Sequence, residues 1–449
     1  MKLSKQQIVD YDKAYNQHPW LTGSVEPLAI ERAEGIYFYD YDGKRYYDMS
    51  CQLTCANIGY GHKTISDAIK AQLDILPYNA PMYATAPKSE LAKRIIDLAP
   101  DNMAKVFFTC GGSDANEAAI NMARTVTGRS KIFSRYRSYH GSTLGAGNLS
   151  GDPRRFSLET PAAAGFIKFL DPYLYRGELT FKSDQDASNY YLKLLEQQIV
   201  YEGRDQIAAI AVESVTGANG VIIPPDGYLQ GLRALCDKYG ILLIADEVMA
   251  GFGRTGKPFS FEHWGIKPDI ISFAKGITSG YVQLGGVIVS RRVADFYNDK
   301  VFQFGLTYSG HTLACAAGVA CLDFYEEHKI FERVGRVGVL LGKLLEEQKA
   351  KHRCVGDVRY IGLFSAVELV KDKTTREPLV PYGRDPDGVM KRIFGMLRTR
   401  GFSTYGRENN INVTPPLIIT EEELKSAFVI LDEVLTIVDD DTISRSKSL

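Results

Sequence analysis

The middle of the chain alternates short apolar runs with longer amphipathic stretches. The stretches 113–128 and 227–240 place apolar residues at helical spacing, and Gly128 fits a helix C-cap. Strands that are apolar at nearly every position are buried on both faces, as in parallel sheets. The alternation therefore predicts an α/β domain with a mostly parallel central sheet flanked by helices. The runs expected to form strands are 105–110, 131–136, 207–214, 241–248, 269–276 and 284–290.

The pattern changes toward both ends of the chain. Residues 35–49 look like a β-hairpin with Asp-Gly at its turn. After about residue 330 the chain has long charged helices, such as 337–352, and shorter strands, such as 360–369. We therefore predict two domains, a large one and a smaller α+β one built from both chain ends. The predicted boundaries are 61–325 for the large domain, and 1–60 together with 326–449 for the small domain.

Composition narrows the function classes. The 449 residues carry a formal net charge of −1, which gives no support for nucleic-acid binding or a basic membrane-binding surface. No apolar run reaches the roughly 18 residues that a membrane-spanning helix needs. The N-terminal segment lacks the apolar core of a signal peptide, so we expect a cytoplasmic protein. The seven scattered cysteines favour free thiols over disulfides or a zinc site, and no metal site is predicted.

The stretch ADEVMAGFGRTG (245–256) contains the G-x-G-x-x-G pattern of a dinucleotide-binding loop. Such a loop follows a strand and opens a helix whose N-terminus meets the pyrophosphate. Here the residues after Gly256 include two prolines and lack helical periodicity. The acidic residue expected about 20 positions later, which would hold the ribose, is also missing. A nicotinamide-dependent dehydrogenase therefore stays only as a distant alternative.

Asp246 and Lys275 each follow an apolar strand at its carboxyl end. Ligands of parallel α/β sheets bind outside these strand ends. An ammonium group after a buried run is costly unless it is paired or used chemically, and such a lysine can form a Schiff base. A carboxylate nearby suits pyridoxal phosphate, because it keeps the pyridine nitrogen of that cofactor protonated. Taken alone, Asp246 fits a cap of the following turn equally well.

Two loops complete the predicted cofactor site. The stretch TCGGSDANEA (109–118) runs from a strand through glycines into a helix, and its backbone N–H groups suit a phosphate. The alternative is a plain helix start capped by Ser113. The stretch YRSYHGST (136–143) follows the next strand, and Tyr139 is placed to lay its ring against an aromatic cofactor. The alternative there is a buried Tyr–His pair in a loop.

Together these motifs resemble those of class III aminotransferases, which are pyridoxal-phosphate-dependent enzymes of fold type I. The matching segments, in chain order, are TCGGSDANEAA, SYHGST, IADEVMAGFGRTG, PDIISFAKGITSG and TYSGHTLACAA. The resemblance covers nearly the whole chain, from 18–20 to 415–420. Each motif is weak alone, but the ordered set is specific.

The resemblance implies a role for each matched residue. Lys275 resembles the lysine that holds the cofactor and later moves a proton, and Asp246 looks like the partner of the pyridine nitrogen. Thr307 is similar to a threonine that reaches the phosphate of the neighbouring subunit's cofactor, which implies a homodimer or a dimer of dimers; its alternative is a turn residue. The other implied cofactor contacts are Tyr139 and Val248 on the ring faces, Gly112 and Ser113 at the phosphate, and Glu213.

Departures from the family pattern bear on the substrate. Relatives that act on 4-aminobutyrate or ornithine usually carry arginine after the His-Gly of the tyrosine loop, where this chain has Ser142, as in taurine-type transaminases. The stretch SGDPRR (150–155) also resembles that branch, and its Arg154 or Arg155 is placed to bind a sulfonate or carboxylate. The alternative is a solvated surface pair.

A second substrate clue lies near the C-terminus. Many relatives place a mobile arginine ten residues before the first proline of PPL, where this chain has Tyr405. Arg407 lies two residues later and suits a carboxylate, because arginine binds that group in a bidentate way. The predicted substrate contacts are Trp20, Arg155 and Arg407.

We therefore predict an aminotransferase that moves an amino group from a small ω-amino acid or amine, such as taurine or β-alanine, to a 2-oxo acid. The acceptor is expected to be pyruvate or 2-oxoglutarate. Lys275, Asp246 and Tyr139 are the predicted catalytic residues. An amino-acid epimerase is the main alternative, because it shares the cofactor and the architecture.

Overall fold

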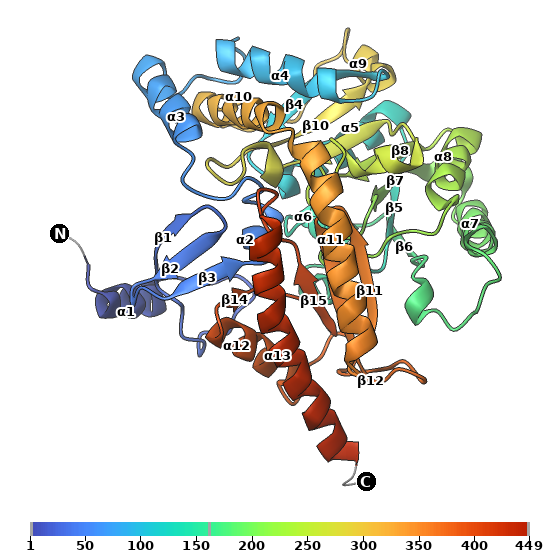
Figure 1. The fold of residues 1–449 in the computed structure, drawn as a ribbon. Helices are drawn as coiled ribbons and strands as arrows, with labels where there is room; N and C mark the ends of the chain where they lie inside the picture. Colours follow the sequence, from blue (N-terminus) through green and yellow to red (C-terminus); the bar gives the residue numbers. More distant parts are fainter. Residues whose placement is uncertain (1–2, 160–162, 447–449) are drawn as a thin grey trace.

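A seven-stranded sheet forms the centre of the computed structural model, which describes residues 3–159 and 163–446, with side chains through residue 440. The strand order is β4–β10–β9–β8–β7–β5–β6 (Figure 1). Only β10 runs antiparallel to its neighbours β4 and β9, which confirms the mostly parallel sheet. The strands are β4 (Met103–Thr109), β5 (Lys131–Arg135), β6 (Phe166–Phe169), β7 (Ile207–Glu213), β8 (Leu242–Asp246), β9 (Ile270–Phe273) and β10 (Gly285–Ser290).

Helices cover both faces of this sheet, because successive strand residues point to opposite sides. On β8, Leu242 and Ile244 belong to the core cluster that contains the buried face of α5 (Gly112–Thr127). The residues between them, Leu243 and Ala245, join a separate cluster with α8 (Tyr228–Tyr239). Other helices of this part are α3 (Lys63–Ile75), α4 (Ala86–Leu98), α6 (Leu144–Leu149), α7 (Asp184–Tyr201), α9 (Arg291–Phe296) and α10 (Thr312–Glu327).

The predicted elements of the central part form close to their expected positions. Helix α5 ends at Gly128, whose φ of 67° is the left-handed conformation of a C-cap and whose N–H donates to the Arg124 carbonyl. Strands β8 and β9 are shorter than expected, because the chain leaves the sheet after Asp246 and Phe273. Residues 247–248 and 274–276 therefore lie in loops at the sheet edge.

Two smaller sheets accompany the central one: the first combines segments from both chain ends, and the second is built from C-terminal strands alone. One contains β1 (Ile30–Glu34), β2 (Tyr37–Asp40), β3 (Arg45–Asp48) and β14 (Phe402–Ser403), and β14 pairs with β3 in parallel. Strands β2 and β3 are the predicted hairpin. The other contains β11 (Val355–Ile361), β12 (Phe364–Asp372), β13 (Glu377–Pro378) and β15 (Asn410–Val413). The domain boundaries themselves remain a prediction.

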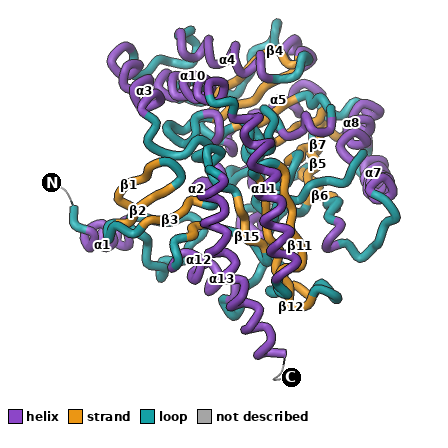
Figure 2. Tube along the Cα trace, viewed as in Figure 1, coloured by secondary structure: helices purple, strands orange, loops and turns teal. Residues whose placement is uncertain are grey.

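Further helices accompany these sheets: α11 packs against β11, and α12 and α13 pack against β14 (Figure 2). They are α1 (Lys5–Tyr15), α2 (Cys51–Thr54), α11 (Ile330–Lys351), α12 (Val389–Thr399) and α13 (Glu421–Ser446). In the described part of the chain, none of the helices has the length and apolar character needed to cross a membrane.

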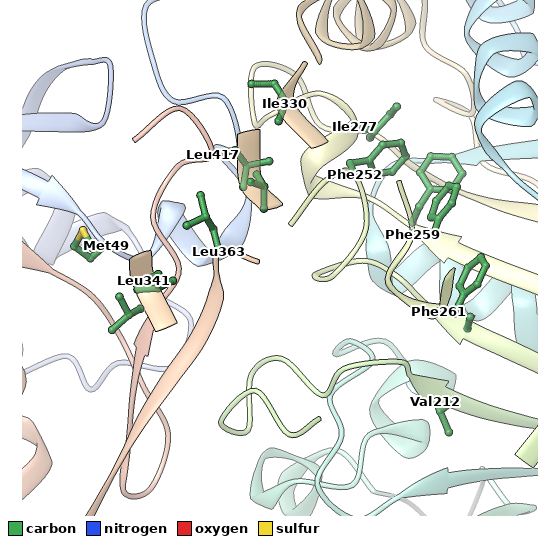
Figure 3. Packing of buried hydrophobic residues seen from close by; sticks show 14 of the residues in the cluster. Met49, Val212, Phe252, Phe259, Phe261, Ile277, Ile330, Leu341, Leu363 and Leu417 are labelled. Carbon is green, nitrogen blue, oxygen red and sulfur yellow. The ribbon is translucent and has the colours of Figure 1, made fainter. Parts of the chain in front are cut away.

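One hydrophobic core continues from the central sheet into the C-terminal part (Figure 3). Phe261 lies on its central side, and Leu363 and Leu417 lie on its C-terminal side. Phe252 and Ile277, from the loops after β8 and β9, fill the space between them. The loops that carry the candidate active-site residues are thus anchored in apolar packing on both sides, which favours a rigid site.

Candidate active site

Two of the three predicted catalytic residues, Asp246 and Lys275, lie at one edge of the central sheet. Strands β8 and β9 are parallel neighbours, with Asp246 in register with Ser272. Asp246 ends β8, and Lys275 lies just past the end of β9. Because parallel strands end at the same edge, the sequence prediction that this edge carries both residues is met by the structure.

Asp246 is held by three hydrogen-bond donors. Its Oδ2 accepts from Asn116 Nδ2 at 2.8 Å and lies 2.6 Å from His140 Nδ1, and its Oδ1 accepts from the Val248 N–H at 3.0 Å. Asp246 is only 3% exposed. The bond to the carboxylate requires the proton of His140 on Nδ1, so the histidine fixes the orientation of Asp246.

Lys275 has a φ of 50°, the left-handed region that is costly for a residue with a side chain. Burial lowers the pKa of its ammonium group, and the positive charge of Arg154 lowers it further. The Cys55 thiol, Asp246 and Glu213 act in the opposite direction. The net lowering makes the neutral, nucleophilic amine more accessible than in an exposed lysine.

The N-terminus of α5 forms the predicted phosphate cradle. Helix α5 is capped by Gly111 and begins at Gly112, so Ser113 lies inside its first turn and is not the cap. A Cβ atom at Gly112 would lie 2.9 Å from Val248 Cγ1, so only glycine allows this close approach. The unpaired N–H groups and the dipole of this helix favour an anion here.

The loop after β5 positions the Tyr139 ring. The Tyr139 N–H donates to Glu213 Oε1 at 3.1 Å, and the Gly217 N–H donates to Oε2 at 2.7 Å. Glu213 therefore holds two loop backbones in place, and its predicted contact with the cofactor stays a prediction. The Tyr139 hydroxyl lies 2.9 Å from Ser142 Oγ. The Trp20 ring packs edge-on against the Tyr139 ring, with 6.4 Å between the ring centroids.

The adjacent residues Arg154 and Arg155 have different surroundings in the structure. The Arg154 guanidinium stacks 3.5 Å above the Tyr139 ring, and its Nε donates to Asp152 Oδ2 at 2.9 Å. Arg155 instead pairs with Glu159 and donates to the Gly151 carbonyl at 3.1 Å. The structure thus favours Arg154 over the predicted Arg155 as the arginine beside the site.

Arg407 is a half-buried cation beside Arg154. Burial and the like charge of Arg154 lower the pKa of its guanidinium, while Asp152 and Tyr139 act in the opposite direction. Within the residues whose side chains are described, no hydrogen bond or ion pair satisfies the Arg407 guanidinium. A desolvated cation without a partner is costly, so this position suits an anionic group of a ligand.

The short segment α2 is a left-handed turn and not an ordinary helix, and Cys55, directly after it, acts electrostatically on Lys275. Cys51, Gln52, Leu53 and Thr54 have φ values between 42° and 64°. Non-glycine residues in this conformation cost about 1–2 kcal/mol each, and such strain concentrates at functional sites. The turn places the Thr54 hydroxyl 3.3 Å from the Tyr405 hydroxyl.

The glycine loop that follows Asp246 binds its own chain. No helix follows it; the next element is the short 3₁₀ turn Ser260–Trp264, which removes the context that a dinucleotide site needs. Arg254 in this loop is fully buried and donates to Asn57 Oδ1 at 2.8 Å and to the Pro415 carbonyl at 2.6 Å. The acceptors of Arg254 are thus oxygen atoms from the N-terminal and C-terminal parts of the chain.

Thr307 is the predicted residue that the chain does not bring to its own Lys275. It is exposed in a loop, and its carbonyl accepts from the Tyr78 hydroxyl at 3.0 Å. In the described part of this chain, Thr307 has no contact with Lys275 or Asp246, as expected if it serves a second subunit.

Comparisons with known proteins identify the family of this chain. The family model for aminotransferase class III matches residues 22–435. The chain belongs to the class III aminotransferases. It is 33% identical to the taurine–pyruvate aminotransferase of Bilophila wadsworthia, over 98% of this chain and 99% of that one. It is 35% identical to the putrescine–pyruvate aminotransferase of Pseudomonas aeruginosa, over 91% and 89%.

A solved structure is similar to this chain throughout. The taurine:2-oxoglutarate aminotransferase from Bifidobacterium kashiwanohense, in complex with pyridoxal phosphate and glutamate, is 52% identical. It superimposes with a TM-score of 0.96, over 98% of this chain and 100% of that one. This class III aminotransferase therefore has fold type I, uses pyridoxal phosphate, and acts on a small amine donor and a 2-oxo acid acceptor.

The residues present fit that cofactor. Asp246 is buried and oriented, Lys275 is partly buried with a lowered pKa, and the N-terminus of α5 is open to an anion. We expect Asp246 to hold the ring nitrogen, Gly112 and Ser113 the phosphate, and Tyr139 and Val248 the two ring faces. These contacts of the class III aminotransferase remain predictions until a cofactor complex is determined.

Sequence reasoning missed several contributors to this site. Asn116 and His140 were not assigned to Asp246, because contacts between side chains from different loops leave no local pattern. A histidine directly after the predicted ring-stacking Tyr139 was the available signal. Thr54 was also missed, since a left-handed turn of non-glycine residues becomes visible only in three dimensions.

Proposed function

We propose that this aminotransferase takes the amino group of taurine or a similar small ω-amino acid and passes it to 2-oxoglutarate or pyruvate. One observation carries the proposal: Arg407 is a half-buried cation without a partner among the described side chains, beside Arg154 and the Tyr139 ring. The unpaired positive charge of Arg407 favours acidic substrates and disfavours a diamine such as putrescine. The taurine-acting relatives support the same donor class.

The chain's own residues account for the reaction steps. Arg407 binds the acidic group of the donor and later that of the acceptor, because both reactants of a ping-pong cycle occupy one site. Lys275, released as a free amine, moves a proton at the carbon that carries the amino group. Bound pyridoxal phosphate supplies the electron-accepting ring and carries the amino group between the two half-reactions. Asp246 and Tyr139 keep the reacting groups oriented.

We also propose that the active enzyme is a homodimer with shared sites. Large apolar side chains are exposed on segments near Thr307: Ile75 is 77% exposed, Met82 is 78% exposed and Val301 is 74% exposed. The hydrogen bond from Tyr78 to the Thr307 carbonyl joins these segments. Apolar surface of this kind marks an interface, and a second copy of the chain would bury it and carry Thr307 to the partner's cofactor phosphate.

A donor and acceptor screen tests the proposal. Purified, cofactor-loaded protein is incubated with taurine, β-alanine, 4-aminobutyrate or putrescine, each with 2-oxoglutarate or pyruvate, and amino acid formation is measured. We expect the highest kcat/KM with an acidic ω-amino acid and no turnover by Lys275→Ala. Preference for putrescine would contradict the donor class. Racemisation of an amino acid without any oxo acid, detected by chiral chromatography, would favour the epimerase alternative.

A further inference from the structure

Tyr405 is held in one orientation at the site. Its carbonyl accepts from the Asn412 N–H at 3.0 Å, which fixes its backbone to β15. The Tyr405 side chain is half-buried, and its hydroxyl lies 3.3 Å from Thr54 Oγ1. The positive charge of Arg154 lowers the pKa of the Tyr405 hydroxyl, and Tyr405 in turn raises the pKa of Arg407. The phenol thus belongs to the same polar cluster as the two arginines.

Thr54 is an equally fixed partner. It lies in the left-handed turn, is 1% exposed, and its N–H donates to the Ser50 carbonyl at 2.8 Å. The next residue, Cys55, acts electrostatically on Lys275. The Thr54 hydroxyl is therefore turned toward Tyr405 and away from solvent.

The Tyr405 phenol is suited to donate a hydrogen bond. Burial raises its pKa, so the hydroxyl stays protonated. Hydrogen bonding to Thr54, and then to the buried amide of Asn412, opposes this rise of the pKa. If Thr54 donates to the phenol oxygen, the O–H of Tyr405 is free to donate to a ligand.

The number and arrangement of donors distinguish two kinds of acidic group. A carboxylate is planar and has two oxygens, which the planar fork of Arg407 can satisfy. A sulfonate has three oxygens arranged as a pyramid, so one oxygen lies outside the plane of a bidentate arginine. Arg154 already donates to Asp152, and the Tyr405 hydroxyl beside Arg407 can supply a donor for that oxygen.

We propose that the Tyr405 hydroxyl, oriented by Thr54 and acting beside Arg407, selects a sulfonate over a carboxylate as the acidic group of the amino donor. The inference rests on the proposed function and makes it more specific: taurine is preferred over β-alanine because of Tyr405. Tyr405 contacts the substrate, whereas Thr54 is a positioning residue.

Kinetics with two donors of similar size test this assignment. Tyr405→Phe removes the hydroxyl and keeps the ring, and it should lower kcat/KM for taurine by about 10- to 100-fold, the effect of one hydrogen bond to a charged group. For β-alanine the loss should stay below about 3-fold. Thr54→Val should shift the same ratio in the same direction by a smaller factor. The matched control is Tyr201→Phe, because Tyr201 is 83% exposed at the end of α7.

Anion binding gives a readout independent of turnover. Ethanesulfonate and propionate copy the acidic ends of the two donors without the amino group, and calorimetric titration of the cofactor-loaded protein measures both. We expect Tyr405→Phe and Thr54→Val to weaken ethanesulfonate binding and leave propionate binding nearly unchanged. The visible absorption of the bound cofactor should be unaltered, since the substitutions leave the cofactor contacts intact.

The outcomes separate the inference from the proposed function. Equal losses for taurine and β-alanine, or unchanged taurine kinetics, would overturn the role of Tyr405. If Tyr405→Phe fails to fold, the Thr54→Val ratios decide in the same way. If the wild-type protein turns over neither donor, the proposed function fails instead. A wild-type preference for taurine that Tyr405→Phe abolishes and Tyr201→Phe retains supports both.

Discussion

His140 Nδ1 lies 2.6 Å from Asp246 Oδ2, and both side chains are buried at the carboxyl end of β8. The other ring nitrogen of His140 is buried without a partner among the described residues, so the Asp246 contact is the main polar contact of the ring. A carboxylate that must stay charged and aimed at a ring nitrogen benefits from a fixed donor behind it. This pairing links the loop after β5 to the strand that carries Asp246.

Replacing His140 should therefore weaken the action of Asp246. His140→Phe keeps a ring and removes the donor, and the loss of one hydrogen bond to a charged group predicts a fall in kcat of about 10- to 100-fold. Cofactor affinity, followed by its visible absorption, should fall as well. The control is His328→Asn, because His328 stacks on Phe324 away from Asp246. Unchanged kcat and cofactor affinity in His140→Phe would show that Asn116 alone suffices to orient Asp246.

Glu247 predicts a dependence of stability on pH. Burial raises the pKa of this carboxyl to about 7, against the donors Ser214 and Ser260. Between its ordinary pKa, 4.5, and about 7, the folded protein binds more protons than the unfolded chain, so stability falls as pH rises through this range. The loss amounts to at most about 3 kcal/mol.

The variant Glu247→Gln cannot ionise, so it should escape this loss. Urea unfolding of the apoprotein should show Glu247→Gln gaining on the wild type as pH rises from about 5 to about 8. Glu347→Gln, at an exposed site on α11, is the control and should show no such trend. A gap between Glu247→Gln and the wild type that stays constant with pH would contradict the raised pKa of Glu247.

The adjacent arginines offer a matched pair. Arg154 stacks on the Tyr139 ring, whereas Arg155 pairs with Glu159 outside the site. We expect Arg154→Ala to raise KM for the acidic donor by about 10-fold, because the stacked guanidinium that holds the Tyr139 ring beside Arg407 is lost, and Arg155→Ala to change it by less than about 2-fold. Steady-state kinetics with taurine measures both. A larger effect of Arg155→Ala would restore the original sequence prediction.

Shared active sites predict complementation between two defective chains. Lys275→Ala lacks the amine in its own site, and Thr307→Ala fails to complete the site of its partner. In a mixed dimer, one site combines the intact Lys275 of one chain with the intact Thr307 of the other. Refolding an equal mixture should restore activity well above that of either variant alone. Mixtures that remain as inactive as the separate variants would contradict a cofactor site completed across the interface.

The sequence was sufficient for the central sheet because its signal is local. Apolar runs identified every strand from β4 to β10 except the short β6, and Asp246 and Lys275 stood at strand ends. Arg154 and Arg155 are neighbours with the same chemistry, so only the opposing charges of Asp152 and Glu159 separate them. Contacts such as the one between Thr54 and Tyr405 join residues 351 positions apart, and no local pattern predicts them.

The contacts of Arg254 in the glycine loop are also long-range and could not be predicted from a local pattern. The G-x-G-x-x-G pattern suggested a nucleotide, and the missing helix argued against one. The buried guanidinium explains what the loop does: it joins Asn57 to the backbone of Leu363 and Pro415. Hydrogen bonds to residues far away in the sequence thus hold the loop that follows Asp246.

Transfer of a labelled amino group tests the central claim most directly. Taurine carrying an isotopic label on its nitrogen is incubated with the cofactor-loaded protein and 2-oxoglutarate or pyruvate, and the new amino acid is analysed by mass spectrometry. We predict labelled glutamate or alanine with the wild-type protein and none with Lys275→Ala. Label that stays entirely on taurine while another amine is consumed, or transfer that persists in Lys275→Ala, would contradict the account.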